Sequence, residues 1–85
     1  MQNITREMRG IPLWLLREYL EEMGGTAIND NLIQADRWKV ILTKMEPFKL
    51  GSLEVGQVLV EIEIDDKHSD DFFKIFNQKT LRAGG

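Results

Sequence analysis

The residues that could do chemistry are few, and most of them lie near residue 68. His68 is the only imidazole, and the chain contains no cysteine. Together with the carboxylates of Asp66, Asp70 and Asp71, His68 could form a metal site. The same carboxylates suit the start of a helix, where negative charge meets the positive end of the helix dipole. We therefore interpret this segment as a solvated loop that leads into a helix, and we expect no bound metal.

A second group of carboxylates lies along one predicted strand. Glu61, Glu63 and Asp65 occupy every second position, so they share a face and successive members lie about 7 Å apart. This spacing is close to that of paired acid and base groups, but it is also typical of the solvent face of an amphipathic strand. The sequence contains no phosphate-binding glycine loop and no nucleophile motif. We predict no catalytic residues, no cofactor and no enzyme activity.

The pair Gly84-Gly85 is the most suggestive chemical feature of the sequence. Ubiquitin-like sulfur carriers use a flexible Gly-Gly end, because only glycine lets the backbone enter the narrow channel where its carboxylate is adenylated. Glycine is also common after helices and at frayed ends, and the predicted elements do not follow the ubiquitin-like order. A carrier role through these two glycines is therefore an alternative hypothesis.

The composition limits the classes of protein that are possible. The chain has 85 residues, which is enough for one domain over residues 1–85. Its formal net charge is -3. Nucleic-acid binding requires a surplus of Lys and Arg, so the acidic balance argues against it. No segment has the length and apolarity of a signal peptide or a membrane span. We expect a cytoplasmic protein that contacts no membrane.

The clearest element is a helix over residues 12–23. Pro12 suits its first turn because proline lacks the N–H that would be unpaired there. Gly24-Gly25 ends it. The apolar positions recur at helical spacing on one face; they are Leu13, Leu16, Leu20 and Met23, widened by Leu15 and Tyr19.

The rest of the chain alternates between apolar and polar residues, which predicts strands. Five strands are expected, over residues 4–9, 32–36, 38–43, 48–55 and 58–65. In this interpretation Glu46-Pro47 interrupts one strand, Gly51 is a bulge or a bend, and Gly56-Gln57 is a tight turn. A second helix is expected from Ser69, as its N-cap, to about Leu81. Its apolar face comprises Phe72, Phe73, Ile75 and Phe76, and residues 82–85 are expected to fray.

These elements predict a two-layer α+β domain with an antiparallel sheet in the order β-α-β-β-β-β-α. Both helices should cover the face that carries Trp38, Val40, Leu42, Val58, Val60, Ile62 and Ile64. The opposite face should carry Lys39, Ile41, Thr43, Leu59, Glu61 and Glu63. That second face would be open or used for assembly, so a homodimer is expected as one use of it.

The candidate contact residues are Trp14, Ile41, Leu59, Gly84 and Gly85. Trp14 lies beside the apolar stripe of the first helix, so we favour a place in the core, with an exposed anchor for a partner as the alternative. A small-molecule cavity is a further alternative, with a lining of Trp14, Tyr19, Trp38 and Phe48. Arg6, Arg9, Lys39, Lys44 and Lys49 could form a modest basic patch, but they are dispersed among acidic residues, which favours a role in keeping the surface soluble.

Several stretches resemble one known family. They are residues 12–26 (PLWLLREYLEEMGGT), residues 46–53 (EPFKLGSL), residues 58–63 (VLVEIE), Phe72-Phe73 and the glycine-ending tail. Together they resemble an uncharacterised domain found at the C-terminus of proteins related to the small subunit of molybdopterin synthase (MoaD-related proteins). In those relatives the domain follows a sulfur carrier, which is absent from this chain.

The resemblance implies a fold of the TATA-binding-protein-like type. It also implies an accessory or protein-interaction role linked to sulfur transfer in molybdenum-cofactor synthesis. The expected partner is a sulfur carrier or a molybdopterin-synthase component. The family assigns no catalytic residues, so none is carried over. Because this functional link rests on domain fusion in relatives, it indicates the process in which the chain takes part but not its mechanism.

Overall fold

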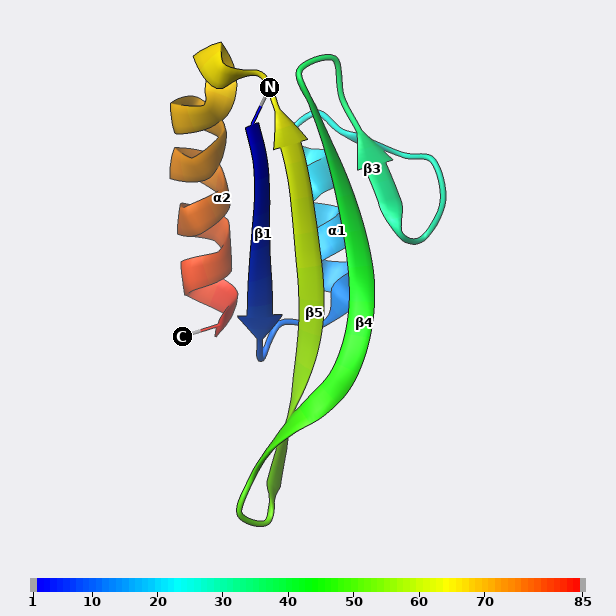
Figure 1. Cartoon of the computed structure of the whole chain (residues 1–85), viewed down its shortest axis with the longest axis vertical. Helices are drawn as coiled ribbons and strands as arrows, with labels where there is room; N and C mark the ends of the chain where they lie inside the picture. Colours follow the sequence, from blue (N-terminus) through cyan, green and yellow to red (C-terminus); the bar gives the residue numbers. More distant parts are fainter. Residues whose placement is uncertain (1, 85) are drawn as a thin grey trace.

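The computed structural model describes the backbone of residues 2–84 and the side chains of residues 2–81. The described residues contain five strands and two helices, and Figure 1 shows how the longer elements are arranged. The elements in chain order are β1 (Gln2–Arg9), α1 (Leu13–Glu22), β2 (Thr26–Ala27), β3 (Leu32–Gln34), β4 (Trp38–Leu50), β5 (Leu53–Ile64), a short 3₁₀ turn η1 (Asp66–His68) and α2 (Ser69–Gly84). The predicted α+β class, with a five-stranded antiparallel sheet and two helices, is confirmed.

The sheet has the strand order β1-β5-β4-β3-β2, and every pair of neighbours is antiparallel. The first strand therefore lies beside the last one, with Ile4 opposite Ile62. The long β4–β5 hairpin forms the middle of the sheet. Because β1 is an edge strand, its outer edge has no neighbouring strand among the described residues.

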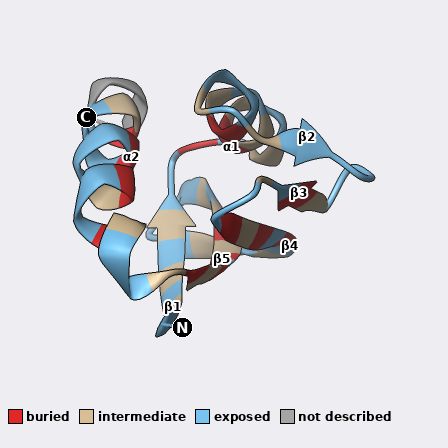
Figure 2. Ribbon diagram, turned by 90° about the horizontal axis from the view of Figure 1, so that it is seen from above, coloured by how far each residue is buried: buried red, intermediate tan, exposed pale blue. Residues whose placement is uncertain are grey.

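The core lies between one face of the sheet and both helices, which lie on the same side of it (Figure 2). Side chains of successive strand residues point to opposite faces, so alternate residues of β4 and β5 are buried. The buried residues of β4 and β5 are those predicted, namely Trp38, Val40, Leu42, Val58, Val60, Ile62 and Ile64. They are joined by Ile33, Ile11, Leu16 and Leu20, and by Phe72 and Phe76 of α2.

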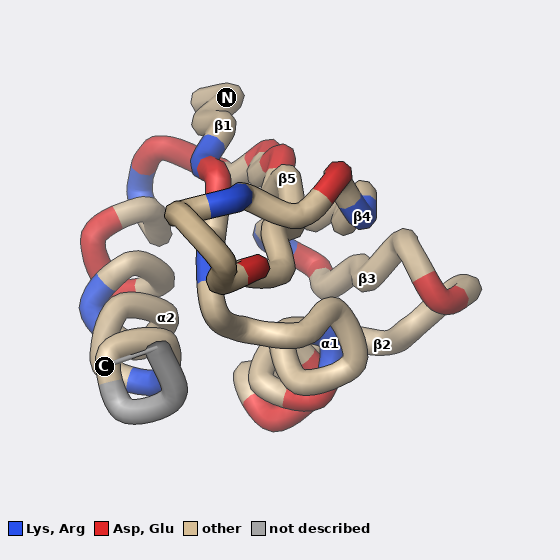
Figure 3. The backbone as a smooth tube through the Cα atoms, turned by 90° about the horizontal axis from the view of Figure 1, so that it is seen from below, with Lys and Arg blue, Asp and Glu red and all other residues tan. Residues whose placement is uncertain are grey.

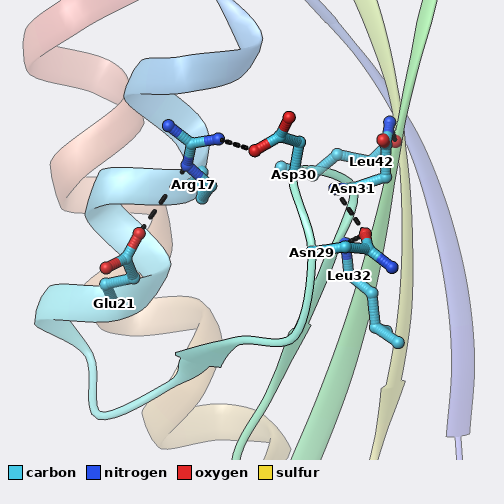
Figure 4. Close-up of polar contacts among 7 residues, drawn as sticks. All are labelled: Arg17, Glu21, Asn29, Asp30, Asn31, Leu32 and Leu42. Atoms are coloured by element: carbon cyan, nitrogen blue, oxygen red, sulfur yellow. Dashed lines mark hydrogen bonds and ion pairs between the residues drawn. The ribbon is translucent and has the colours of Figure 1, made fainter.

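The loop between β2 and β3 is tied to both layers by polar contacts (Figure 4). The Oδ1 atom of Asn29 accepts hydrogen bonds from the backbone N–H groups of Asn31 and Leu32, which closes a turn. The amide of Asn31 donates to the carbonyl oxygen of Leu42 at 2.8 Å. From the helix layer, Arg17 donates to Asp30 at 2.9 Å. The loop therefore fixes β3 against α1 as well as β4.

The structure corrects the expected positions of the turns in the second half of the chain. β4 continues through Glu46-Pro47, and the irregularity there is a change of register between Met45 and Phe48. The turn lies at Gly51-Ser52, where Gly51 has a φ of 62°. Positive φ at the first residue of a two-residue hairpin loop is typical of a type II′ turn and favours glycine. Gly56-Gln57 lies inside β5, so the predicted turn there is wrong. Gly51 starts the hairpin turn rather than a bulge or bend within a strand, and the strand predicted over residues 48–55 is divided between β4 and β5.

The start and the faces of α2 also differ from the prediction. Ser69 is buried, and its hydroxyl donates to the side chain of Gln2 at 2.9 Å rather than capping the helix. The capping interaction lies earlier, where the carboxylate of Asp65 accepts a hydrogen bond from the N–H of Lys67. Ile75 is exposed, so it does not belong to the apolar face. The helix continues to Gly84, three residues beyond the expected end at Leu81.

Candidate functional site

The candidate site is the face of the sheet that no described helix covers, which we call the open face. By strand register it comprises Asn3, Thr5, Glu7 and Arg9 of β1, Gln57, Leu59, Glu61 and Glu63 of β5, Lys39, Ile41, Thr43 and Met45 of β4, and Leu32 and Gln34 of β3. All six residues expected on this face from the sequence lie there. Two of the predicted contact residues, Ile41 and Leu59, are among them.

Ile41 and Leu59 lie near the middle of the open face. Ile41 is opposite Glu61 on one side and Leu32 on the other. Leu59 is two residues from Glu61 on the same face, so Ile41 and Leu59 are diagonal cross-strand neighbours within reach of each other. Ile41 is 39% exposed and Leu59 is half-buried. Together with Leu32, they form an apolar centre that remains in contact with solvent.

Charged side chains surround this apolar centre. Glu63 and Lys39 are opposite each other on β5 and β4, and Glu7 lies beside Leu59 on β1. At the far end of the face, the guanidinium of Arg9 lies 4.0 Å from the centre of the Phe48 ring and its Nε donates to Gln57 at 2.9 Å. An apolar centre within a polar rim is the usual anatomy of a protein-binding surface.

Trp14 is not in the core, which corrects the favoured interpretation of its position. Its side chain is 58% exposed. It lines a groove of about 500 Å³ between the start of α1 and the β4–β5 hairpin, with Ile11, Leu13, Lys44 and Val58 among the other lining residues. This groove lies on the helix side of the sheet. The structure therefore separates Trp14 from Ile41 and Leu59 rather than bringing them together.

The four aromatic residues considered for a small-molecule cavity lie in different places. Trp38 is a core residue with its ring 5.2 Å from that of Phe72. Tyr19 faces the ammonium of Lys79, and Phe48 lies under Arg9. Trp14 lines the groove without the other three. The expected shared lining is therefore wrong for the pockets found among the described residues.

His68 lies beside Asp65 rather than within a cluster of ligands. Its Nδ1 atom is 3.7 Å from the Oδ2 atom of Asp65, which is too far for a hydrogen bond. Over the part of the chain that the structure describes, no three His, Cys, Asp or Glu side chains are placed to hold a metal ion. Glu61 and Glu63 belong to the open face, whereas Asp65 follows the end of β5 and caps η1.

The hydrogen bond from the backbone N–H of Lys67 is the main reason why the pKa of Asp65 is lowered. Desolvation opposes this shift, and electrostatic interactions with His68, Lys67 and Arg37 add to it. A lowered pKa in the folded state stabilises the fold above the pKa of the unfolded state, and this contribution is lost as the pH falls through the folded pKa. We expect the unfolding free energy of Asp65→Asn to fall less with decreasing pH than that of the unmodified chain. Urea denaturation at a series of pH values below 5 would measure it.

Asp66→Asn is the matched control for this prediction, because it leaves the hydrogen bond between Asp65 and Lys67 intact. Its stability should fall with decreasing pH in parallel with that of the unmodified chain. A parallel decline in Asp65→Asn as well would contradict the role of Asp65.

The cations considered as a basic patch are distributed over different surfaces (Figure 3). Arg6 lies under α2, where its guanidinium donates to Asn77 at 2.7 Å and lies 4.6 Å from the centre of the Phe73 ring. Lys44 lines the groove, and Lys49 is 3.9 Å from Glu54 near the hairpin turn. Arg9 and Lys39 are on the open face. The structure therefore does not bring these five residues into one patch.

The remaining two predicted contact residues lie at the end of α2. Gly84 is the last residue of that helix. Gly85 lies outside the described residues. Neither described helix has the length and apolarity needed to span a membrane.

The fold and the open face define a class of small two-layer α+β domains with one sheet face free of helices. A family model described as archaeal MoaD-like protein matches residues 4–85, which is nearly the whole chain. The chain belongs to this family, as its resemblance to MoaD-related proteins indicated. None of the curated proteins matches it.

The groove and the hairpin beside it were missed by sequence reasoning. The predicted turn at Gly56-Gln57 would have produced two short strands in place of one long β5. A signal was available in Gly51-Ser52, since glycine followed by serine between apolar runs also favours a hairpin turn. Strands of 13 and 12 residues then extend past the rest of the sheet.

Proposed function

We propose that this chain is a non-enzymatic protein-interaction domain that binds a molybdopterin-synthase component through the open face of its sheet. The observation that carries the proposal is the apolar centre of Ile41, Leu59 and Leu32 within a charged rim, on a face that no described helix covers. A buried apolar centre supplies most of the binding energy at such surfaces, and the rim excludes water. Membership in the archaeal MoaD-like family supports the choice of partner.

The rim supports a specific mode of binding. The charges of Glu7, Glu61 and Glu63 exceed those of Arg9 and Lys39, so the open face is slightly acidic. A complementary partner surface would therefore carry a small surplus of Lys or Arg around an apolar patch. Such complementarity raises the association rate and selects the partner more than it raises affinity. The chemistry of sulfur transfer would then belong to the partner.

Calorimetric titration against the molybdopterin-synthase subunits of the same organism tests the proposal. The double variant Ile41→Ser/Leu59→Ser should weaken binding at least about tenfold, because the apolar centre loses its buried side chains. Ile75→Ser is the matched control, since Ile75 is 45% exposed on α2, on the helix side of the sheet. Absence of binding to every subunit, or equal binding by the double variant, would refute the proposal.

A carrier role through Gly84-Gly85 is the second candidate, because the family match extends to residue 85. Gly84 lies within α2, so a carrier would have to unwind the end of that helix before an enzyme could act on it. The intact mass of the protein from its native host distinguishes the two candidates. A thiocarboxylate or a conjugate that disappears when Gly85 is deleted would favour the carrier. An unmodified mass would leave the interaction domain as the better explanation.

Two finer expectations accompany this proposal. The first is a TATA-binding-protein-like fold, supported by the succession of a strand, a helix, four strands and a helix along the chain. The second is a cytoplasmic location, supported by the absence of a signal-like apolar segment in the given sequence and of cysteine.

A further inference from the structure

The β4–β5 hairpin extends well beyond the other strands (Figure 1). We call residues 45–57 of this hairpin the arm. β3 pairs with β4 only as far as Ile41, and β1 pairs with β5 only as far as Gln57. The two strands of the arm therefore have no third strand beside them for most of their length. A two-stranded ribbon is marginally stable in water by itself, so an arm of this length is expected to gain stability from another surface.

The tip of the arm is apolar. Leu50 and Leu53 are opposite each other next to the turn, and they are 63% and 65% exposed. Phe48 and Val55 form the next pair on the same face, because they lie two residues closer to the sheet. Charged residues, prolines or bulges usually protect exposed strand ends from association. The arm has Pro47, the irregularity between Met45 and Phe48 and the charged pair Lys49–Glu54, but its tip also exposes two leucines.

The groove that Trp14 lines lies at the base of the same arm. Its lining includes Ile11, Leu13, Trp14, Val55 and Val58, so most of it is apolar. Its volume of about 500 Å³ is several times that of a cavity of roughly 150 Å³, which is large enough for a benzene molecule. It can therefore accept two leucine side chains.

We propose that a second copy of this chain fills the groove: two arms lie antiparallel around a two-fold axis, and Leu50 and Leu53 of each insert beside Trp14 of the other. A protrusion and a complementary groove at the two ends of one arm satisfy the requirement of a two-fold interface, in which the same patch on each copy binds the other. The arm shares Met45 and Gln57 with the end of the open face. The contacts proposed here are made by Leu50, Leu53 and Trp14 rather than by Ile41 and Leu59, so the dimer and the proposed function are tested by different variants.

The charges of the arm favour its own copy as the occupant. The chain has a net charge of -3, but the arm and the groove lining together contain two lysines, Lys44 and Lys49, and two glutamates, Glu46 and Glu54. The region therefore has no net charge, and two copies do not repel each other there. Lys44 and Glu54 line the groove, so the groove has one positive and one negative side chain. These can face the oppositely charged members of the Lys49–Glu54 pair, which lies beside the tip of the other copy's arm.

The available surface is also sufficient. A stable interface buries about 800 Å² per partner, which is about one seventh of the accessible surface of 5679 Å². The arm and residues 10–14 make up about one fifth of the chain, and the arm is more exposed than the average segment. The two segments can therefore supply the area that a stable dimer requires.

Sedimentation equilibrium of the full chain tests this proposal. The unmodified chain should dimerise, and Leu50→Ser/Leu53→Ser should raise the dimer dissociation constant at least about 100-fold, because four leucine side chains leave the interface. Ile28→Ser should leave the dissociation constant unchanged. Circular dichroism checks that each variant is folded. A monomeric unmodified chain, or dissociation by Ile41→Ser/Leu59→Ser but not by the arm variant, would overturn the proposal.

Cross-linking provides a second test that does not depend on removing apolar side chains. The chain has no cysteine, so introduced thiols react only with each other. Ser52→Cys places a thiol at the tip, and Lys44→Cys places one in the groove. A mixture of the two variants should form mainly the mixed disulfide under mild oxidation. Rapid formation of a disulfide dimer by Ser52→Cys alone would show tips in contact and overturn the antiparallel arrangement.

Discussion

Phe76→Ala is expected to lower the free energy of unfolding by about 3–5 kcal/mol, the range typical of removing a fully buried aromatic side chain. Phe76 is completely buried, and its ring is stacked on that of Phe72 with 5.6 Å between centroids. It belongs to the cluster through which α2 covers the sheet. Since domains of this size are stable by about 5–15 kcal/mol, the variant should lose a large part of its stability. Urea denaturation followed by circular dichroism measures the change.

Ile75→Ala is the matched control, because Ile75 is adjacent on the same helix but 45% exposed. Its unfolding free energy should change by less than about 1 kcal/mol. Equal losses in both variants would contradict the packing described for α2. In both variants we expect a single unfolding transition, because we propose that residues 1–85 form one domain.

Gly25→Ala is expected to destabilise the fold by at least about 2 kcal/mol, for a steric reason. A Cβ atom at this position would be 2.5 Å from Trp38 Cη2 and 2.6 Å from Ile33 Cγ2. It would also be 2.9 Å from the carbonyl oxygen of Leu20, which accepts a hydrogen bond from the Gly25 N–H. A backbone oxygen cannot move away cheaply, so the chain leaving α1 must shift. Thermal and urea denaturation measure the loss.

Gly56→Ala is the control for this prediction. A Cβ atom there would meet nothing within 4 Å, and the residue lies in β5 with an ordinary φ. Its stability should stay the same or rise slightly, because alanine reduces the freedom of the unfolded chain. If Gly25→Ala is as stable as Gly56→Ala, the close approach at Gly25 does not restrict the fold.

The parts of the fold that the sequence predicted well are those with a strong local period. The alternation in β4 and β5 placed Val40, Val60 and Ile62 on the covered face and Ile41 and Leu59 on the open face, because successive strand side chains point to opposite sides. The helical spacing of Leu16 and Leu20 likewise identified the buried stripe of α1. These assignments depend on neighbouring residues along the chain, so they are readable without tertiary information.

The errors arose where long-range contacts decide between local alternatives. Gly56-Gln57 and Gly51-Ser52 are both acceptable hairpin turns, and the structure places the turn at the second of them. Pairing of β5 with β1 through Gln57 and Arg9 keeps the backbone extended at the first. Ser69 was an equally reasonable helix cap, but its hydroxyl is bonded to Gln2, which is 67 residues away. No local pattern contains that contact.

The exposure of Trp14 shows the same limit. Its position beside the apolar stripe predicted burial. In the structure its side chain is exposed and lines the groove between the start of α1 and the arm.

The sequence by itself determined the class of the fold, the covered and open faces, the family and the absence of a recognisable catalytic motif, because each follows from local period or from residue identity. The tertiary structure alone decided the register of the β4–β5 hairpin, the arm and the groove. These features depend on which strands pair and where pairing stops, and that is set by contacts between residues far apart in the chain.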